Sequence, residues 1–153
     1  MQKVLFVCLG NICRSPTAEG VFREVVKAAG RESDFEIDSA GTGSWHVGEA
    51  PDRRAQHACL RAGSDISAHR ARRVSMSDFS SFDLILACDR QNYADLLKLA
   101  PTEARGKVHL LMHFAPDAAV DEVPDPYYGN DAGFDRTVEL CRTACNGVLK
   151  ALS

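Results

Sequence analysis

The sequence predicts an α/β fold, in which a single doubly wound domain holds a four-stranded parallel sheet flanked by helices. Short apolar runs of strand length alternate with longer segments whose apolar residues recur at helical spacing, in the order β-α-β-α-β-α-β-α. The chain has 153 residues, the size of one domain, so we expect residues 1–153 to fold as one unit. A content of 45% hydrophobic and 25% charged residues is typical of a folded globular protein.

The first strand and helix are predicted close to the N-terminus. Residues 4–8 form a continuous apolar run, which is typical of a buried parallel strand. Ser15 and Pro16 then predict the start of a helix, because serine is a favoured N-cap and proline a favoured first-turn residue. The helical apolar pattern continues to Gly30, where we expect the helix to end.

The remaining elements follow the same alternation. We expect strands over residues 35–40, 83–88 and 107–112, and helices over residues 52–62, 89–99 and 134–152. Residues 113–133 contain three prolines and form a connection longer than usual, which favours a functional role for this loop. In a doubly wound sheet, ligands bind beyond the carboxyl ends of the strands.

Composition and charge exclude several classes of protein. The net charge of −3 argues against a nucleic-acid partner. No apolar run approaches the roughly 20 residues that span a bilayer, so we expect no membrane insertion. The N-terminus lacks the pattern of a signal peptide, which predicts a cytoplasmic protein. The six cysteines are scattered and form no C-x2-C pair, so we expect thiols rather than disulfides or a structural zinc site.

The segment from Cys8 to Ser15 reads C-x5-R-S and lies where the first strand passes into the first helix. A tight loop at a helix N-terminus directs successive backbone N–H groups at one point, which makes an anion site. Arg14 can bind two phosphate oxygens with its planar fork. The same positive field stabilises a thiolate at Cys8, and Ser15 can donate a hydrogen bond to that sulfur. We therefore predict a phosphate-binding loop that carries its own nucleophile.

Other interpretations of these segments are weaker. A buried cysteine at the end of a core strand is common, but here an arginine stands six residues after Cys8 and is followed by Ser-Pro at the predicted start of a helix. The G-x4-G-K-[ST] pattern of nucleotide-binding loops is absent. Gly41 and Gly43 follow a predicted strand, but residue 46 is histidine where a dinucleotide-binding motif requires a third glycine.

Three motifs together resemble those of the low-molecular-weight protein tyrosine phosphatases: CLGNICRSPTAE from residue 8, DSAGT at 38–42 and DPYYGND at 125–131. The resemblance in length and motif order covers essentially the whole chain. It implies hydrolysis of phosphotyrosine monoesters on proteins through a phosphocysteine intermediate, without metal or cofactor. Proteins that carry phosphotyrosine are the implied partners, and a tyrosine kinase is a plausible one. Nothing in the sequence indicates the oligomeric state.

Asp125 lies in the long loop, directly before Pro126, which restricts its backbone. An aspartate before a proline is most often only a turn element. Here it matches the general acid of the family, so we expect Asp125 to protonate the leaving oxygen. It would then activate water against the phosphocysteine.

Further residues complete the predicted site. Trp45, Tyr127 and Tyr128 are candidates for the walls of an aromatic slot, deep enough for phosphotyrosine to reach Cys8 while phosphoserine stops short. The resemblance also implies that Asn11, Ser15, Ser39 and His69 form a polar network that holds the phosphate-binding loop in shape. The predicted phosphate-binding residues are Leu9, Gly10, Asn11, Ile12, Cys13 and Ser15, and the predicted supporting residues are Ser39 and His69.

Three alternative functions remain within this fold. A thioredoxin-coupled arsenate reductase needs two further cysteines about seven residues apart, whereas no cysteine follows Cys88 before Cys141. A protein-arginine phosphatase carries threonine at the fifth loop position, where this chain has Ile12. A catalytically inactive phosphopeptide-binding module would not need Cys8, Arg14 and Asp125 together.

Cys13 lies five residues after Cys8 in the same loop. Their sulfurs could therefore meet, and an activated thiolate is the group most easily oxidised to a sulfenic acid. Cysteine is also a common space-filling residue, and this would be the simpler role for Cys13. In the family that the chain resembles, the matching cysteine is protective, so we expect redox regulation through a Cys8–Cys13 disulfide.

Overall fold

The computed structural model describes all 153 residues, and its core is one sheet of four parallel strands. The strands are β1 (Gln2–Cys8), β2 (Phe35–Gly41), β3 (Leu84–Ala87) and β4 (Val108–Leu110). Their order in the sheet is β2-β1-β3-β4, so β1 lies between β2 and β3. The chain changes direction across the sheet at β1, and a ligand site is expected beyond the carboxyl end of this strand. The predicted fold class is confirmed.

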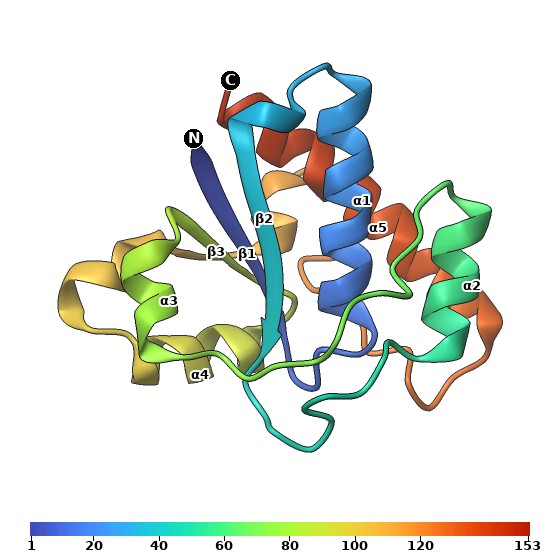
Figure 1. Cartoon of the computed structure of the whole chain (residues 1–153), viewed down its shortest axis with the longest axis horizontal. Coiled ribbons are helices and arrows are strands. Elements are labelled where there is room, and N and C mark those ends of the chain that lie inside the picture. The colour runs from blue at the N-terminus through green and yellow to red at the C-terminus, as the bar shows by residue number, and fades with distance from the viewer.

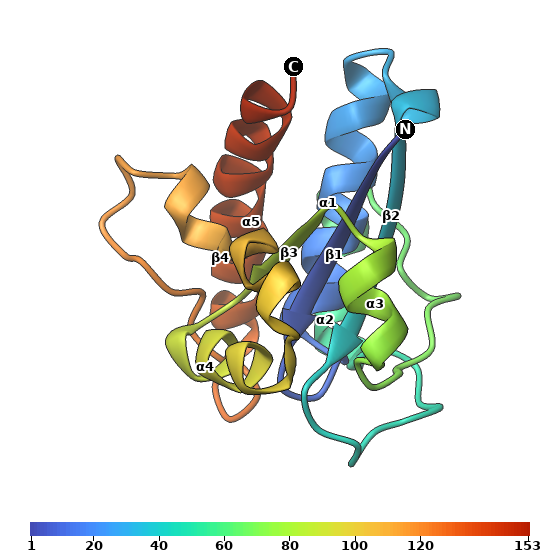
Figure 2. The ribbon, with the colours of Figure 1, turned by 90° about the vertical axis from the view of Figure 1, so that its left-hand side faces the viewer.

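The helices cover both faces of the sheet. They are α1 (Arg14–Ala28), α2 (Arg53–Arg61), α3 (Met76–Ser81), α4 (Arg90–Leu99) and α5 (Asp131–Ala151). Helices α1, α2 and α5 lie on one side of β1 and β2, and α3 and α4 lie on the other (Figure 1; Figure 2). Short 3₁₀ helices occupy Glu32–Asp34, Thr102–Lys107 and Leu111–Phe114. None of the helices has both the length and the apolar character that a bilayer-spanning segment needs.

Alternation along β1 explains how the two layers are held. Val4 and Phe6 belong to the apolar cluster under α1, α2 and α5, whereas Leu5 and Val7 belong to the cluster under α3 and α4. Successive side chains of a strand point to opposite faces, so a continuous apolar run fits a strand buried on both sides. All four side chains are fully buried. The carboxyl end of β1, where Cys8 lies, is therefore fixed by packing on both faces.

The structure corrects several element boundaries. Helix α1 begins at Arg14, and Ser15 is not its N-cap, because the cap position is Cys13 and carries no side-chain cap. Strand β4 ends at Leu110 since a 3₁₀ turn follows at once. The last helix begins at Asp131, three residues before the predicted start.

Helix α3 is not predicted from the sequence because it is only six residues long and partly polar. It has a recognisable start, however. The Ser75 side chain accepts a hydrogen bond from the backbone N–H of Asp78, and the Asp78 carboxylate accepts one from the backbone N–H of Ser75. This reciprocal arrangement is the capping box, a motif that can be read from sequence.

Candidate active site

The phosphate-binding loop connects β1 to α1 and is shaped by its backbone contacts. The carbonyl oxygens of Cys8 and Leu9 accept hydrogen bonds from the backbone N–H groups of residues 42 and 43, both at 2.9 Å. The carbonyl oxygen of Ile12 accepts one from the N–H of Asp52 at 2.8 Å. The loop carbonyls are thereby turned outward, which leaves the concave side to backbone N–H groups. Cys8 is buried at the bottom of this loop. Its Sγ accepts the N–H of Asn11 at 3.2 Å and lies 2.9 Å from the hydroxyl oxygen of Ser15.

Asn11 occupies the left-handed backbone region, with φ of 58°, and is the only residue other than glycine to do so. Its side chain is fully buried and makes four hydrogen bonds. The amide nitrogen donates to the hydroxyls of Ser15 and Ser39 at 2.8 and 3.1 Å. The amide oxygen accepts from Nε2 of His69 and from the backbone N–H of Arg72, both at 3.0 Å. Asparagine tolerates this backbone conformation better than most residues, and the four bonds hold it there.

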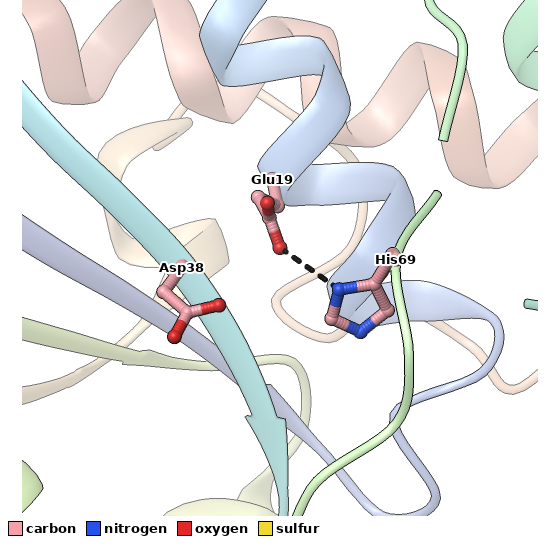
Figure 3. Close-up of side chains that lie close together, drawn as sticks. All are labelled: Glu19, Asp38 and His69. Atoms are coloured by element: carbon pink, nitrogen blue, oxygen red, sulfur yellow. Dashed lines mark ion pairs between the residues drawn. The ribbon is translucent and has the colours of Figure 1, made fainter. Parts of the chain in front are cut away.

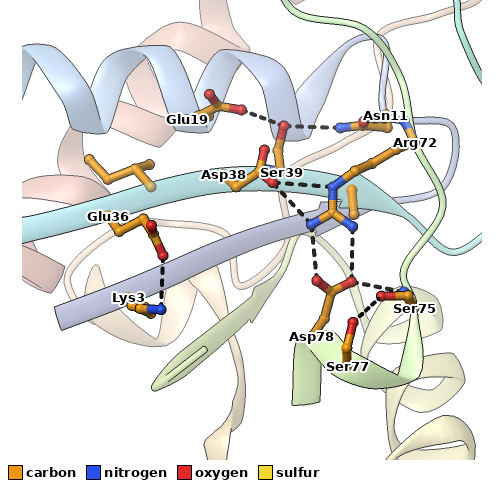
Figure 4. Close-up of polar contacts among 12 residues, drawn as sticks. Lys3, Asn11, Glu19, Glu36, Asp38, Ser39, Arg72, Ser75, Ser77 and Asp78 are labelled. Atoms are coloured by element: carbon orange, nitrogen blue, oxygen red, sulfur yellow. Dashed lines mark hydrogen bonds and ion pairs between the residues drawn. The ribbon is translucent and has the colours of Figure 1, made fainter. Parts of the chain in front are cut away.

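The bonds of Asn11 belong to a wider polar network between β2, α1 and residues 69–73 (Figure 4). The hydroxyl of Ser39 donates to Glu19 at 2.7 Å. The Arg72 guanidinium lies between the carboxylates of Asp38 and Asp78, at 3.1 and 3.0 Å. The segment that carries the Arg72 N–H is thus fastened to both the sheet and α3. The predicted supporting residue Ser39 lies beneath the loop, as the polar network requires.

Glu19, Asp38 and His69 place their ligand atoms within 4.8 Å of one another, which is the arrangement closest to a metal site (Figure 3). Their atoms are already engaged, however. His69 faces Glu19 at 3.6 Å and Asn11 on its other nitrogen, and Glu19 also accepts from the Arg23 guanidinium. Arginine and hydroxyl donors therefore already satisfy both carboxylates, and the cluster fits a support for the loop better than a cation site.

Arg14 is buried at the start of α1 and is held by residues distant in sequence. Its Nη1 donates to the Asp89 carboxylate at 2.6 Å and to the Val123 carbonyl at 3.1 Å. Burial disfavours the charged guanidinium, but the adjacent groups, Asp89 among them, raise the pKa of Arg14 above its ordinary value. Arg14 therefore stays charged, with one edge fixed and the other turned to the site.

Asp125 lies at the mouth of the site, with its side chain about half exposed. Its Oδ2 is 3.7 Å from Nη2 of Arg14, and its Oδ1 accepts the backbone N–H of Tyr127 at 3.1 Å. The carboxylate is thus aimed toward the phosphate-binding loop while remaining accessible to water.

These groups meet in a cavity of about 410 Å³. It is lined by Cys8, Leu9, Gly10, Ile12, Cys13, Arg14, Trp45, His46, Asp125, Tyr127 and Tyr128. The three predicted aromatic residues all line it, but Trp45 is 73% exposed and Tyr128 95% exposed, so these two form the rim rather than the inner wall. The ring of Trp45 lies so close to Gly43 that a Cβ at residue 43 would overlap it.

The second cysteine of the loop, Cys13, is also buried. Desolvation, followed by the nearby negative charge of Asp52, raises the pKa of Cys13 well above its usual range. Cys13 therefore remains a thiol. A larger cavity of about 760 Å³ lies on the other side of the Asp125 loop, but no cysteine lines it.

The structure also reveals contributors that sequence reasoning missed. Asp89, which fixes Arg14, and His46, which lines the cavity, were not predicted. Asp89 lies two residues after the end of β3, at the carboxyl edge of the sheet, and this position is itself a signal for a ligand-site residue. The side chains of Asn11 and Ser15 lie beneath the loop, within the predicted polar network, and do not line the cavity.

The chain is similar to known proteins over its whole length. The family model described as low molecular weight phosphotyrosine protein phosphatase matches residues 3–153. The chain is 48% identical to the phosphatase of that name from Schizosaccharomyces pombe, over 86% of this chain and 85% of the yeast protein.

Solved structures agree with the sequence comparison. A protein tyrosine phosphatase from Entamoeba histolytica superposes with a TM-score of 0.97 at 39% identity, over 99% of this chain and 97% of that one. A Drosophila arginine phosphatase superposes with a TM-score of 0.92 at 32% identity, over 100% and 98% of the two chains. This chain therefore belongs to the family of low molecular weight phosphotyrosine protein phosphatases.

Proposed function

We propose that this protein hydrolyses phosphotyrosine monoesters on proteins by a two-step mechanism centred on Cys8. The observation that carries the proposal is the meeting of a cysteine, an arginine and a carboxylic acid in one cavity: Cys8, Arg14 and Asp125. Each has the position that its role requires. Cys8 lies at the bottom, Arg14 beside it and Asp125 at the mouth, where a leaving group would depart.

In the first step, the Cys8 thiolate attacks phosphorus while the bond from phosphorus to the tyrosine oxygen breaks. The proton of Asp125 passes to that oxygen, so tyrosine leaves as the neutral phenol. Arg14 and the N–H groups of the loop bind the equatorial phosphoryl oxygens, where charge accumulates. Because Asp89 already holds Nη1, the guanidinium cannot turn away from this position. The hydroxyl of Ser15 supports the sulfur.

In the second step, Asp125, now a carboxylate, accepts a proton from water as the water oxygen attacks the phosphocysteine. The sulfur leaves as the thiolate, which the Asn11 N–H and the Ser15 hydroxyl contact in the resting state. Inorganic phosphate is released and Asp125 is protonated again. No other reactant is needed, because water supplies the oxygen and the proton.

Shape favours phosphotyrosine over the alternative substrates. Cys8 lies at the bottom of the loop, with Tyr127 and the rim aromatics above it, so a planar ring can span the distance to the sulfur. The similarity to an arginine phosphatase keeps phosphoarginine as a second candidate. Ile12 offers no hydroxyl to a phosphoramidate at the cavity wall, which favours the phenolic ester.

We further propose that the protein works in the cytoplasm, since a reducing compartment keeps a catalytic thiol such as Cys8 reduced. Its partners would be phosphotyrosine proteins, with a tyrosine kinase as a plausible example. Peroxide would oxidise the Cys8 thiolate to a sulfenic acid, which would condense with the Cys13 thiol to a disulfide and water. This disulfide protects Cys8 from irreversible oxidation.

Phosphate release from a phosphotyrosine peptide in the presence of EDTA tests the function. We expect full activity in the wild type and none in Cys8→Ser, which should still bind vanadate or phosphate because Arg14 and the loop remain. Activity that EDTA removes, or that survives Cys8→Ser, would contradict the mechanism. A higher rate on phosphoarginine than on phosphotyrosine would favour the alternative function.

A further inference from the structure

Arg54, near the start of α2, contacts the loop that carries Asp125. Its Nη2 donates to the carbonyl of Tyr127 at 2.9 Å, and its Nη1 donates to the carbonyl of Gly129 at 3.2 Å. These carbonyls lie two and four residues beyond Asp125 in sequence. Both ends of one guanidinium therefore hold the segment that follows Asp125.

The same side chain is fastened to the phosphate-binding loop through Asp52. Nε and Nη2 of Arg54 donate to the two oxygens of Asp52, at 3.1 and 3.0 Å. The backbone N–H of Asp52 in turn donates to the carbonyl of Ile12 at 2.8 Å. Burial raises the pKa of Asp52, but the hydrogen bonds from Arg54 outweigh it and lower that pKa. Asp52 is therefore a carboxylate, and it links Arg54 to the loop that holds the nucleophile.

Aromatic rings fix the plane of the guanidinium. Its carbon lies 4.5 Å from the ring centroid of Phe134 and 5.7 Å from that of Tyr127. Phe134 is buried on α5, so it provides a rigid surface under Arg54. An arginine that is stacked on rings and donates bidentately cannot be replaced by lysine without loss of geometry.

Asp125 itself has few contacts that would hold it in place. Its side chain accepts the N–H of Tyr127 at 3.1 Å and lies 3.7 Å from Arg14. Residues 115–130 contain no helix or strand. The position of the acid therefore depends on the position of the Tyr127 backbone, and Arg54 binds the carbonyl of that same residue.

We propose that Arg54 is a positioning residue that holds the Asp125 loop against the phosphate-binding loop, so that the acid can reach the leaving oxygen. The proposal rests on the proposed function, in which Asp125 is the general acid. A displacement of about 1 Å can cost a catalytic group about 100-fold in rate. Arg54 does not line the cavity of the proposed site, so its removal should act through proton transfer and leave phosphate binding nearly intact.

The experiment measures kcat/KM for a series of aryl phosphates whose phenols range from acidic, such as 4-nitrophenol, to unsubstituted phenol. This parameter reports the step that forms the phosphocysteine, in which the leaving group takes its proton. Five proteins are compared: wild type, Arg54→Met, Arg54→Lys, Asp125→Asn and the control Arg61→Met. Arg61 also lies on α2 and pairs with Asp135 of α5 at 2.6 Å, but it makes no contact with the Asp125 loop.

We expect Arg54→Met to lose about 10- to 100-fold on phenyl phosphate and several-fold less on 4-nitrophenyl phosphate. The dependence of log(kcat/KM) on the pKa of the leaving group should become steeper than in the wild type and approach the slope found for Asp125→Asn. The inhibition constant of inorganic phosphate should change less than about threefold. Arg54→Lys should recover only part of the loss because one ammonium group cannot donate to Tyr127, Gly129 and Asp52 together. Arg61→Met should follow the wild type.

The two proposals fail in different ways. If Arg54→Met lowers kcat/KM by one common factor for every leaving group, while Asp125→Asn steepens the series, Arg54 has a structural role only and the positioning proposal is wrong. If Asp125→Asn itself leaves the slope unchanged, the assignment of the general acid fails first. Thermal unfolding of all five proteins identifies any variant that does not fold. If Arg54→Met does not fold, Arg54→Lys is compared with wild type instead.

Discussion

Replacement of Asn11 measures how much of the phosphate-binding loop depends on one side chain. Asn11→Ala removes four buried hydrogen bonds and places alanine at a φ of 58°. A typical hydrogen bond contributes about 0.5–1.5 kcal/mol to stability, and the left-handed conformation costs alanine about 1–2 kcal/mol. Because such contributions are not fully additive, we expect the free energy of unfolding to fall by about 2–4 kcal/mol.

Asn11→Gly separates the two contributions. Glycine adopts the left-handed region freely, but it adds about 0.5–1 kcal/mol of conformational entropy to the unfolded chain relative to alanine. Asn11→Gly should therefore be more stable than Asn11→Ala by roughly 0.5–1 kcal/mol, and it should still lack the side-chain bonds. Both variants should bind phosphate more weakly, since the loop is no longer held in one conformation.

Urea unfolding followed by circular dichroism gives the stabilities, and competitive inhibition by phosphate gives the affinities. The reasoning is refuted if the free energy of unfolding of Asn11→Ala lies within about 0.5 kcal/mol of the wild-type value and the phosphate affinity is unchanged. The loss of four hydrogen bonds should cost more than this in total. An Asn11→Gly protein less stable than Asn11→Ala would show that backbone conformation contributes nothing at this position.

Three further predictions concern other parts of the site. Ile12→Thr should raise activity on phosphoarginine peptides relative to phosphotyrosine peptides. An unchanged ratio of the two activities would show that Ile12 does not determine the substrate preference. Gly41→Ala should lower the free energy of unfolding by about 1–3 kcal/mol and weaken phosphate binding, because the added Cβ would lie 2.7 Å from the carbonyl oxygen of Leu9. Gly106→Ala is the control in the same unfolding assay, since a Cβ at residue 106 meets no atom within 4 Å. Peroxide should inactivate the wild type reversibly, with a Cys8–Cys13 disulfide detected by mass spectrometry, and Cys13→Ser should recover poorly after thiol treatment. Full recovery of that variant would assign Cys13 a packing role only.

The fold could be predicted because each strand carries its own signal. The run through β1 is apolar at every position from Val4 to Val7, and a strand buried on both faces needs this pattern. Strand β4 could not be delimited, since Leu111 and Met112 continue the apolar run but turn into a 3₁₀ helix and pack against the α5 side. The apolar pattern reports burial, and it does not distinguish these two ways of burying a side chain.

The site was predictable where its residues are contiguous. Cys8 and Arg14 lie in one loop, so local spacing was sufficient to find them. Asp89 lies 75 residues from Arg14, and Arg54 lies 73 residues from Tyr127. Such pairs form only when the sheet brings the carboxyl ends of different strands and α2 together. A single sequence contains no signal for them beyond the position of Asp89 after β3.

Ser15 shows how a correct motif can have the wrong local explanation. Serine before proline predicts a helix N-cap, but the structure gives the cap position to Cys13 and directs the Ser15 hydroxyl to the sulfur of Cys8 at 2.9 Å. The same hydroxyl accepts from Asn11. The hydroxyl is thus withdrawn from helix capping and placed between the nucleophile and the residue that shapes the loop.

The six cysteines explain why burial alone does not identify a nucleophile. All six are buried, and desolvation raises the pKa values of Cys13, Cys59, Cys88, Cys141 and Cys145. Cys8 is as inaccessible as Cys13, so exposure does not separate them. The difference is that Cys8 Sγ lies at the end of β1, where it contacts the Asn11 N–H, the Ser15 hydroxyl and the start of α1. The proposed reactivity of Cys8 therefore rests on the hydrogen-bond donors that the loop directs at its sulfur.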